Sequence, residues 1–263
     1  MMTPPRSARL SVAAAAAVAV TALAGCAGSD ETTSDSATAT VPSASASSST
    51  PTSNAAPRTS TRVNPAATAR LHVAASSGDV AEVRRAIADG ADLESRGAEG
   101  RTPLVVATKN QDAASALALL DAGADPNAKD DLQDSAFLYA GAEGFDTILH
   151  GTLRHGADVT SLNRYGGTAL IPAAEHAHTS TISILINAGV PLDVVNKSGW
   201  TALLEAVVLG DGDAAHVDAV RQLLDAGADP SIGDFDGVTP RQHAVDRGQT
   251  AVVAEFDRPR PKR

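Results

Sequence analysis

The histidines and aspartates of this 263-residue chain are spaced in ways that argue against catalysis. His176 and His178 stand two residues apart, and such residues do not face each other on a helix, so the pair does not predict a zinc site. The stretch 211–222 has aspartates but lacks the sixth-position glycine and twelfth-position glutamate of a calcium loop. The sequence also lacks a Gly-x-Ser-x-Gly elbow and a phosphate-binding glycine loop. We therefore expect no enzyme, no metal and no cofactor.

Cys26 is the only cysteine, so no internal disulfide can form. Arg6 and Arg9 precede an alanine-rich stretch, 10–25, which leads into Leu-Ala-Gly-Cys. This order is typical of a secretory signal peptide, and the stretch is too short for a spanning helix. The final tetrapeptide resembles a bacterial lipobox, which implies cleavage before Cys26 and attachment of diacylglycerol to its thiol. We predict a lipoprotein signal peptide at 1–25 and lipidation of Cys26; the alternative is an ordinary cleaved signal followed by an unmodified cysteine.

Residues 26–66 have a different composition, dominated by Ser, Thr, Ala and Pro. Val41 and Val63 are the only large apolar residues there, so burial cannot offset the loss of chain entropy. We expect a disordered tether that reaches roughly 130 Å when fully extended. It would carry the rest of the chain from a membrane through a cell-wall layer, or serve as a neutral spacer.

Beyond the tether, apolar residues recur at steps of 33. The series is Leu71, Leu104, Phe137, Leu170 and Leu203. Glycines repeat with the same step at Gly90, Gly123, Gly156 and Gly189, and Gly227 follows after a longer one. A Thr or Ser before each apolar run suits the cap of a first helix, and the glycine suits the end of a second. The period predicts stacked units of two helices and a turn.

The segment 101–107, Arg-Thr-Pro-Leu-Val-Val-Ala, resembles the Thr-Pro-Leu-His-x-Ala signature of the ankyrin repeat. This resemblance implies an all-α ankyrin-repeat solenoid over 67–257, with about six helix–turn–helix units and hairpin loops between them. We place the units at 67–99, 100–132, 133–165, 166–198, 199–236 and 237–257. The fifth is long, because Leu203 and Arg241 are 38 residues apart, and we expect 211–216 to lengthen the loop between its helices. The segment 258–263 is a basic tail, predicted to be solvated or to touch anionic polymers or headgroups.

Three matching first-helix positions depart from the repeat pattern. Tyr139, Pro172 and Glu205 stand where the first two units have valine. In ankyrin proteins the first helices and hairpin loops line a concave face, so the resemblance predicts that units three to five share one surface. Its predicted residues are Tyr139, Glu143, Arg164, Tyr165, Glu175, His176, Trp200 and Glu205.

This cluster predicts a partner-binding site, because aromatic residues and arginine often dominate binding energy. The alternative is that the aromatic side chains only pack between units while the glutamates cap loop N–H groups. A carboxylate at an otherwise apolar position needs a local partner, so we expect Glu205 to meet backbone donors or Arg164.

The formal net charge is −10, and it becomes −12 once the signal takes away Arg6 and Arg9. An acidic chain with one Trp and two Tyr does not suit nucleic acid. The segments 164–175 and 199–212 resemble exported bacterial ankyrin-repeat lipoproteins, which implies an envelope location and protein binding. We predict a lipid-anchored chain on the outer face of the bacterial cell membrane, whose concave face binds an unidentified envelope protein. The alternative is a receptor for a small envelope molecule or peptide at units three to five.

Overall fold

The computed structural model describes residues 63–259, which form six consecutive pairs of helices. The pairs are α1 (Pro65–Ser77) with α2 (Val80–Ala88), α3 (Pro103–Lys109) with α4 (Ala113–Asp121), α5 (Ala136–Ala142) with α6 (Asp146–Arg154), α7 (Leu170–Glu175) with α8 (Thr179–Asn187), α9 (Ala202–Val208) with α10 (Ala214–Ala226), and α11 (Pro240–Asp246) with α12 (Thr250–Asp257). One short 3₁₀ turn, η1 (Ala98–Gly100), follows the first pair, and this part of the chain contains no β-strand. The predicted all-α solenoid is confirmed. The signal peptide, Cys26 and the tether up to residue 62 lie outside the described residues.

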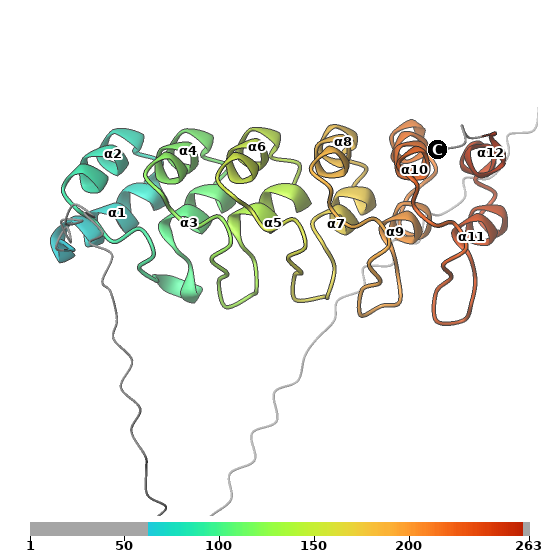
Figure 1. Cartoon of the computed structure of the whole chain (residues 1–263), viewed down its shortest axis with the longest axis horizontal. Coiled ribbons are helices and arrows are strands. Elements are labelled where there is room, and N and C mark those ends of the chain that lie inside the picture. The colour runs from blue at the N-terminus through green and yellow to red at the C-terminus, as the bar shows by residue number, and fades with distance from the viewer. Residues whose placement is uncertain (1–62, 260–263) are drawn as a thin grey trace, which may run out of the picture. The chain divides into compact units, whose positions relative to one another are not determined.

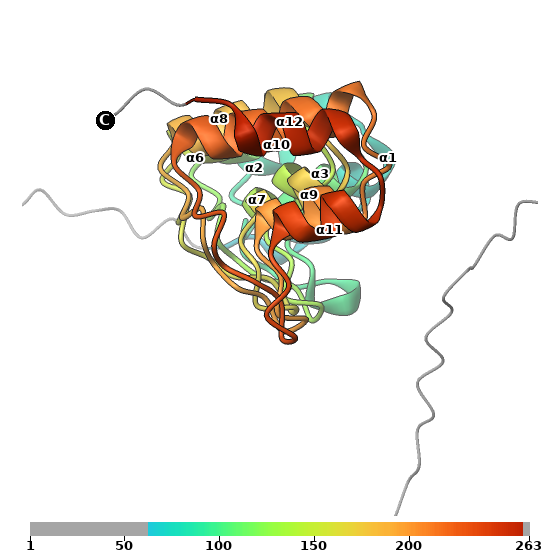
Figure 2. The same ribbon diagram turned by 90° about the vertical axis from the view of Figure 1, so that its right-hand side faces the viewer.

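The helices form two layers along the stack, with the first helix of every pair in one layer and the second in the other (Figure 1). The loops between successive pairs extend beyond the first-helix layer. Seen from the end, they lie over one another and project to the same side (Figure 2). We call the surface formed by the first helices and these loops the concave face.

Local sequence explains where most of the helices begin and end. The side chain at the cap of the first helix accepts a backbone N–H in four of the predicted cases: Thr102, Ser135, Thr201 and Thr239. The expectation is wrong for Thr168, because the N–H of Ile171 bonds to its backbone oxygen, and the buried Thr168 hydroxyl has no hydrogen-bond partner within the described residues. The five periodic glycines all have a positive φ, between 82° and 99°, as expected at helix ends.

The core runs through the whole stack as one apolar cluster, from Leu71 in α1 to Val252 in α12. The five residues of the 33-step series all belong to it, and each is 1 % exposed or less. Because the helices are only six to thirteen residues long, each pair covers its neighbour's apolar side, and the stack is held together by contacts between adjacent units.

Four of the inter-unit loops share one hydrogen-bonded design. We call them finger loops, residues 130–134, 163–167, 196–200 and 234–238. Each begins with an Asp or Asn whose side-chain oxygen accepts the N–H groups two and four residues later, at 2.9 to 3.1 Å: Asp130, Asn163, Asn196 and Asp234. Each has a positive φ at its fourth residue, and in three of the four loops that residue is a glycine. The fingers are therefore defined structures that can hold side chains in place.

The five extra residues of unit five do not simply lengthen a loop. The connection between α9 and α10 has five residues instead of the three between α3 and α4, and α10 has thirteen residues instead of nine. The extra residues extend α10 at its N-terminal end, where Asp213 is the cap. His216, in this first turn, lies against α7, and its Nε2 is 3.1 Å from the backbone oxygen of Glu175. The expectation of a longer loop alone was wrong, because the insertion also folds as an extra helical turn.

Two predicted boundaries need correction. The first helix begins at Pro65 behind the cap residue Asn64, so the expected tether end at residue 66 falls inside α1. At the other end, the predicted tail begins with a residue that is attached to the repeats: the Arg258 side chain is 36 % exposed, but its guanidinium lies 2.6 Å from Asp225 and 3.1 Å from Glu255. The rest of the basic tail, from residue 260 onwards, is outside the described part of the chain.

Candidate functional site

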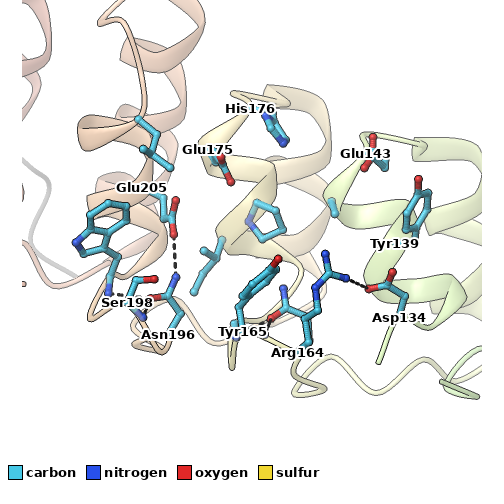
Figure 3. A pocket seen from close by; sticks show the side chains of 17 residues that line it. Asp134, Tyr139, Glu143, Arg164, Tyr165, Glu175, His176, Asn196, Ser198 and Glu205 are labelled. Carbon is cyan, nitrogen blue, oxygen red and sulfur yellow. Dashed lines mark hydrogen bonds and ion pairs between the residues drawn. The ribbon is translucent and has the colours of Figure 1, made fainter. Parts of the chain in front are cut away.

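A pocket of about 340 Å³ opens on the concave face of units three to five. Its lining comes from the finger loops and first helices of these units, as predicted from the repeat positions (Figure 3). The lining includes all eight residues singled out in the sequence: Tyr139, Glu143, Arg164, Tyr165, Glu175, His176, Trp200 and Glu205. Whether they bind a partner stays a prediction. Sequence analysis missed Asp134, Asn196 and Leu209, which also line the pocket.

At the unit-three end, the basic side chains already have an acidic partner within the protein. Lys109 Nζ lies 2.7 Å from an Asp134 oxygen and 4.5 Å from the centre of the Tyr139 ring. Arg164 Nη1 lies 3.6 Å from the other Asp134 oxygen, and its guanidinium stands 4.6 Å from the Tyr165 ring centre. The expectation that Arg164 or backbone donors pair with Glu205 is therefore wrong, because Arg164 pairs with Asp134 in the preceding finger.

The actual partner of Glu205 is Asn196. Glu205 lies in α9 and is only 6 % exposed, and its Oε1 accepts a hydrogen bond from Asn196 Nδ2 at 2.8 Å. Its other oxygen, Oε2, is buried and has no hydrogen-bond partner within the described residues. The pKa of Glu205 is raised to about 7, chiefly by burial and also by the charge of Glu175, while the hydrogen bond from Asn196 lowers it.

Asn196 connects the finger to the helix. Its Oδ1 accepts the backbone N–H groups of Ser198 and Trp200 at 2.9 and 3.0 Å, while its Nδ2 donates to Glu205. Asn196, and not a glutamate, therefore caps the N–H groups of this finger. The 33-residue steps from Asp130 through Asn163 to Asn196 are the sequence signal that could have identified it.

Three glutamates of the pocket have no ion pair among residues 63–259. Glu205 is buried, Glu175 is half-buried and Glu143 is exposed at the rim. Figure 3 shows the carboxylates of Glu175 and Glu205 facing the same space, while Arg164 extends towards Asp134. The pocket therefore gathers unpaired carboxylates at its unit-five end, while at its unit-three end the cations are paired with Asp134.

The two histidines near this site are not on one helix, contrary to the reasoning from sequence. His176 is the residue after α7 and His178 the one before α8, and their ring centres are 5.7 Å apart. Burial, followed by the charge of His176, lowers the pKa of His178. Among residues 63–259, no group of three or more His, Cys, Asp or Glu side chains is arranged to hold a metal ion.

A family model described as ankyrin repeats in three copies matches residues 58–130 and 137–234. The chain belongs to the ankyrin-repeat family. Ankyrin-repeat proteins are generally non-enzymatic scaffolds that act in protein–protein interaction. Every helix in the described part of this member falls short of the length and apolarity needed to span a lipid bilayer.

Individual ankyrin-repeat relatives agree with this assignment. The putative ankyrin repeat protein YahD of Escherichia coli (strain K12) is 36 % identical over 177 residues, which cover 67 % of this chain and 88 % of YahD. The crystal structure of an ankyrin repeat domain from Acinetobacter baumannii AYE is 48 % identical, with a TM-score of 0.69, and the match covers 71 % of this chain and 95 % of that one. A putative ankyrin-containing lipoprotein of Leifsonia xyli subsp. xyli is 64 % identical over 42 residues, 16 % of each chain.

Proposed function

We propose that this ankyrin-repeat chain is a lipid-anchored binding module on the outer face of a bacterial cell membrane, and that it holds a protein partner in the concave-face pocket. The observation that supports the binding site best is Glu205, which lines the pocket and whose buried Oε2 has no hydrogen-bond partner among the described residues. A buried polar atom left unsatisfied costs free energy, and a bound partner can supply the missing donor.

The dimensions of the pocket suit a side chain of a partner. Its volume of about 340 Å³ is at the lower end of the usual range for small-ligand sites, which is roughly 300–1,000 Å³. It opens on the concave face between successive fingers, where an extended segment could continue past the pocket. Tyr139, Tyr165 and Trp200 supply the aromatic contacts that often anchor protein interfaces.

The membrane anchor is supported by the sequence around Cys26 and by the similarity to the Leifsonia lipoprotein. A diacylglycerol carries two acyl chains, which is enough for stable attachment to a bilayer. The segment 26–62 would then separate the repeats from the membrane. The proposal includes no reaction, since the sequence offers no catalytic motif.

A receptor for a small molecule or free peptide is the second candidate. The presence of a pocket of about 340 Å³ lined by Asn196, Glu175 and Glu205 favours this candidate over a purely flat contact surface. The two functions differ in what occupies the pocket in the cell. Photo-crosslinking can identify that occupant.

The test is photo-crosslinking in intact cells with a photoreactive residue in place of Leu209. Leu209 lines the pocket and is 46 % exposed, so its replacement should leave the fold intact. The control carries the same residue in place of His150, which is exposed on the second helix α6. We expect a discrete protein adduct from position 209 and not from position 150. Equal adducts from both positions, or none from position 209, would contradict the protein-binding proposal.

A further inference from the structure

The charges of the pocket are distributed unevenly. Lys109 and Arg164 both contact Asp134 at the unit-three end, so neither reaches the carboxylates of units four and five. At the other end, the side chains of Glu175 and Glu205 have no cationic partner within the part of the chain that the structure describes (Figure 3). Among residues 63–259, no Lys or Arg side chain lines this end of the pocket.

Glu205 is the side chain that a positively charged ligand group would contact. Its side chain is more than nine-tenths buried, and the Asn196 bond fixes one oxygen, Oε1. The second oxygen, Oε2, is buried and has no hydrogen-bond partner among residues 63–259, on a side chain that lines the pocket. An ionised carboxylate without a cation is costly to bury, and a charge-assisted hydrogen bond from a ligand would offset that cost.

The remaining lining favours a guanidinium over an ammonium. A guanidinium is planar, stacks on aromatic rings and carries several donors in a fixed arrangement, so it can serve more than one carboxylate. Trp200 and Tyr165 line the pocket together with Glu175 and Glu205. The protein already uses the same combination in its own Arg164, which stands over Tyr165 and pairs with Asp134.

We propose that the unit-five end of the pocket receives an arginine side chain from the partner protein, whose guanidinium donates to Oε2 of Glu205 and faces Glu175. This inference rests on the proposed function, because it names the chemistry of the partner that the concave face holds. The volume of the pocket suits one long side chain with its flanking backbone outside.

Trp200 makes a direct test possible, because it is the only tryptophan in the chain and lines the pocket. The probe is acetyl-Gly-Arg-Gly-amide, titrated at about pH 8 into the full chain in detergent while Trp200 emission is recorded. A ligand of this size is expected to bind with a dissociation constant of about 1 mM. The matched peptides carry citrulline, which has the shape of arginine without its charge, or lysine.

We expect the citrulline peptide to bind at least about tenfold more weakly, since a hydrogen bond to a charged group is lost. We expect Glu205→Gln to weaken the arginine peptide by at least about tenfold. The matched control is Glu82→Gln, which removes one carboxylate from α2 outside this pocket and should leave binding unchanged. A thermal melt of each variant verifies that it is folded.

Equal binding of the arginine and citrulline peptides would overturn the inference, and so would full binding by Glu205→Gln or the absence of a saturable change. Lysine binding as tight as arginine would overturn the guanidinium assignment. The crosslinking experiment separates this inference from the proposed function. If position 209 captures a partner equally well in Glu205→Gln, the protein-binding function stands and the arginine inference fails. If the arginine peptide binds but position 209 captures no protein, the small-ligand receptor is favoured instead.

Discussion

Asn196 Nδ2 lies 2.8 Å from Oε1 of Glu205, and this bond ties the finger loop between units four and five to α9. The same nine-residue separation joins Asp234, in the finger loop before α11, to His243 in α11, at 2.7 Å. At the finger loop before α7 the corresponding pair is Asn163 and Pro172, and a proline side chain has no polar group to form the bond. A side-chain hydrogen bond between the finger loop and the following helix is thus present in some repeats and absent from another, although the backbone fold is the same.

The first prediction concerns the pH dependence of stability through Glu205. Its pKa in the folded chain is about 7, above the ordinary 4.5, so the folded state binds the proton more tightly than the unfolded state. This contribution is fully present below about pH 4.5, and it is lost as the pH rises towards about 7. Glu205→Gln should therefore be more stable than the parent at about pH 8 by about 2 kcal/mol, with little difference at about pH 4.5.

Urea unfolding of both proteins at the two pH values measures this difference, and subtraction removes the titration of all other groups. The groups facing Glu205 are the carboxylate of Glu175 and the amide of Asn196, and both remain in the variant. An equal stability difference at both pH values would show that Glu205 titrates in its ordinary range.

The second prediction concerns the hydrogen bonds of Asn196, which hold a finger loop together and connect it to α9. Asn196→Ala removes the acceptor of two loop N–H groups and the donor to Glu205, and should cost about 2 kcal/mol of unfolding free energy. Asn163→Ala is the matched control, because Asn163 accepts two N–H groups in its own finger loop but has no hydrogen-bond partner on a helix among residues 63–259. It should cost about 1 kcal/mol. Equal losses, measured by urea unfolding, would mean that the bond to Glu205 contributes nothing.

The third prediction concerns the insertion of unit five. A Cβ placed on Gly210 would lie within 2.2 Å of the backbone oxygen of Ala206 and 2.4 Å of the His216 ring. Gly210→Ala should therefore displace the start of α10 and cost more than about 2 kcal/mol. Gly123→Ala is the comparison. An alanine there would be strained by the positive φ, but its Cβ would meet no atom within 4 Å, so the change should cost about 1 kcal/mol. Thermal or urea unfolding ranks the two, and the reverse order would refute the packing argument.

The fourth prediction concerns the stacked core. Leu203 is 1 % exposed in α9, and Leu203→Ala should cost about 3 kcal/mol through lost burial and the cavity left behind. Leu209→Ala, at a position 46 % exposed, should change stability by less than about 0.5 kcal/mol. Similar effects of the two changes would contradict the assignment of the 33-residue series to the core.

The fifth prediction concerns the anchor. If Cys26 carries diacylglycerol, the chain extracted from cells should partition into a detergent phase, and Cys26→Ser should move it to the aqueous phase. Immunoblotting of the two phases provides the measurement. A parent protein found in the aqueous phase would leave the ordinary cleaved signal as the better interpretation.

Much of the site was visible in the sequence because the repeat places equivalent residues on equivalent surfaces. Tyr139 and Glu205 could be assigned to one face by counting, since a fixed step of 33 carries each position into the next unit. Counting does not show which side chains pair. Arg164 contacts Asp134 of the preceding finger, and Asn196 takes the place next to Glu205 that sequence reasoning gave to Arg164.

The sequence by itself determined the fold, the number of units and the buried positions, because caps, glycine helix ends and the apolar period all act within one unit or between neighbours. Only the tertiary structure decided the partner of Glu205, the folding of the unit-five insertion into α10 and the attachment of Arg258 to the last helices. Those outcomes depend on distances of a few ångströms between side chains and backbone from separate helices and loops, and the spacing of residues along the chain does not fix them.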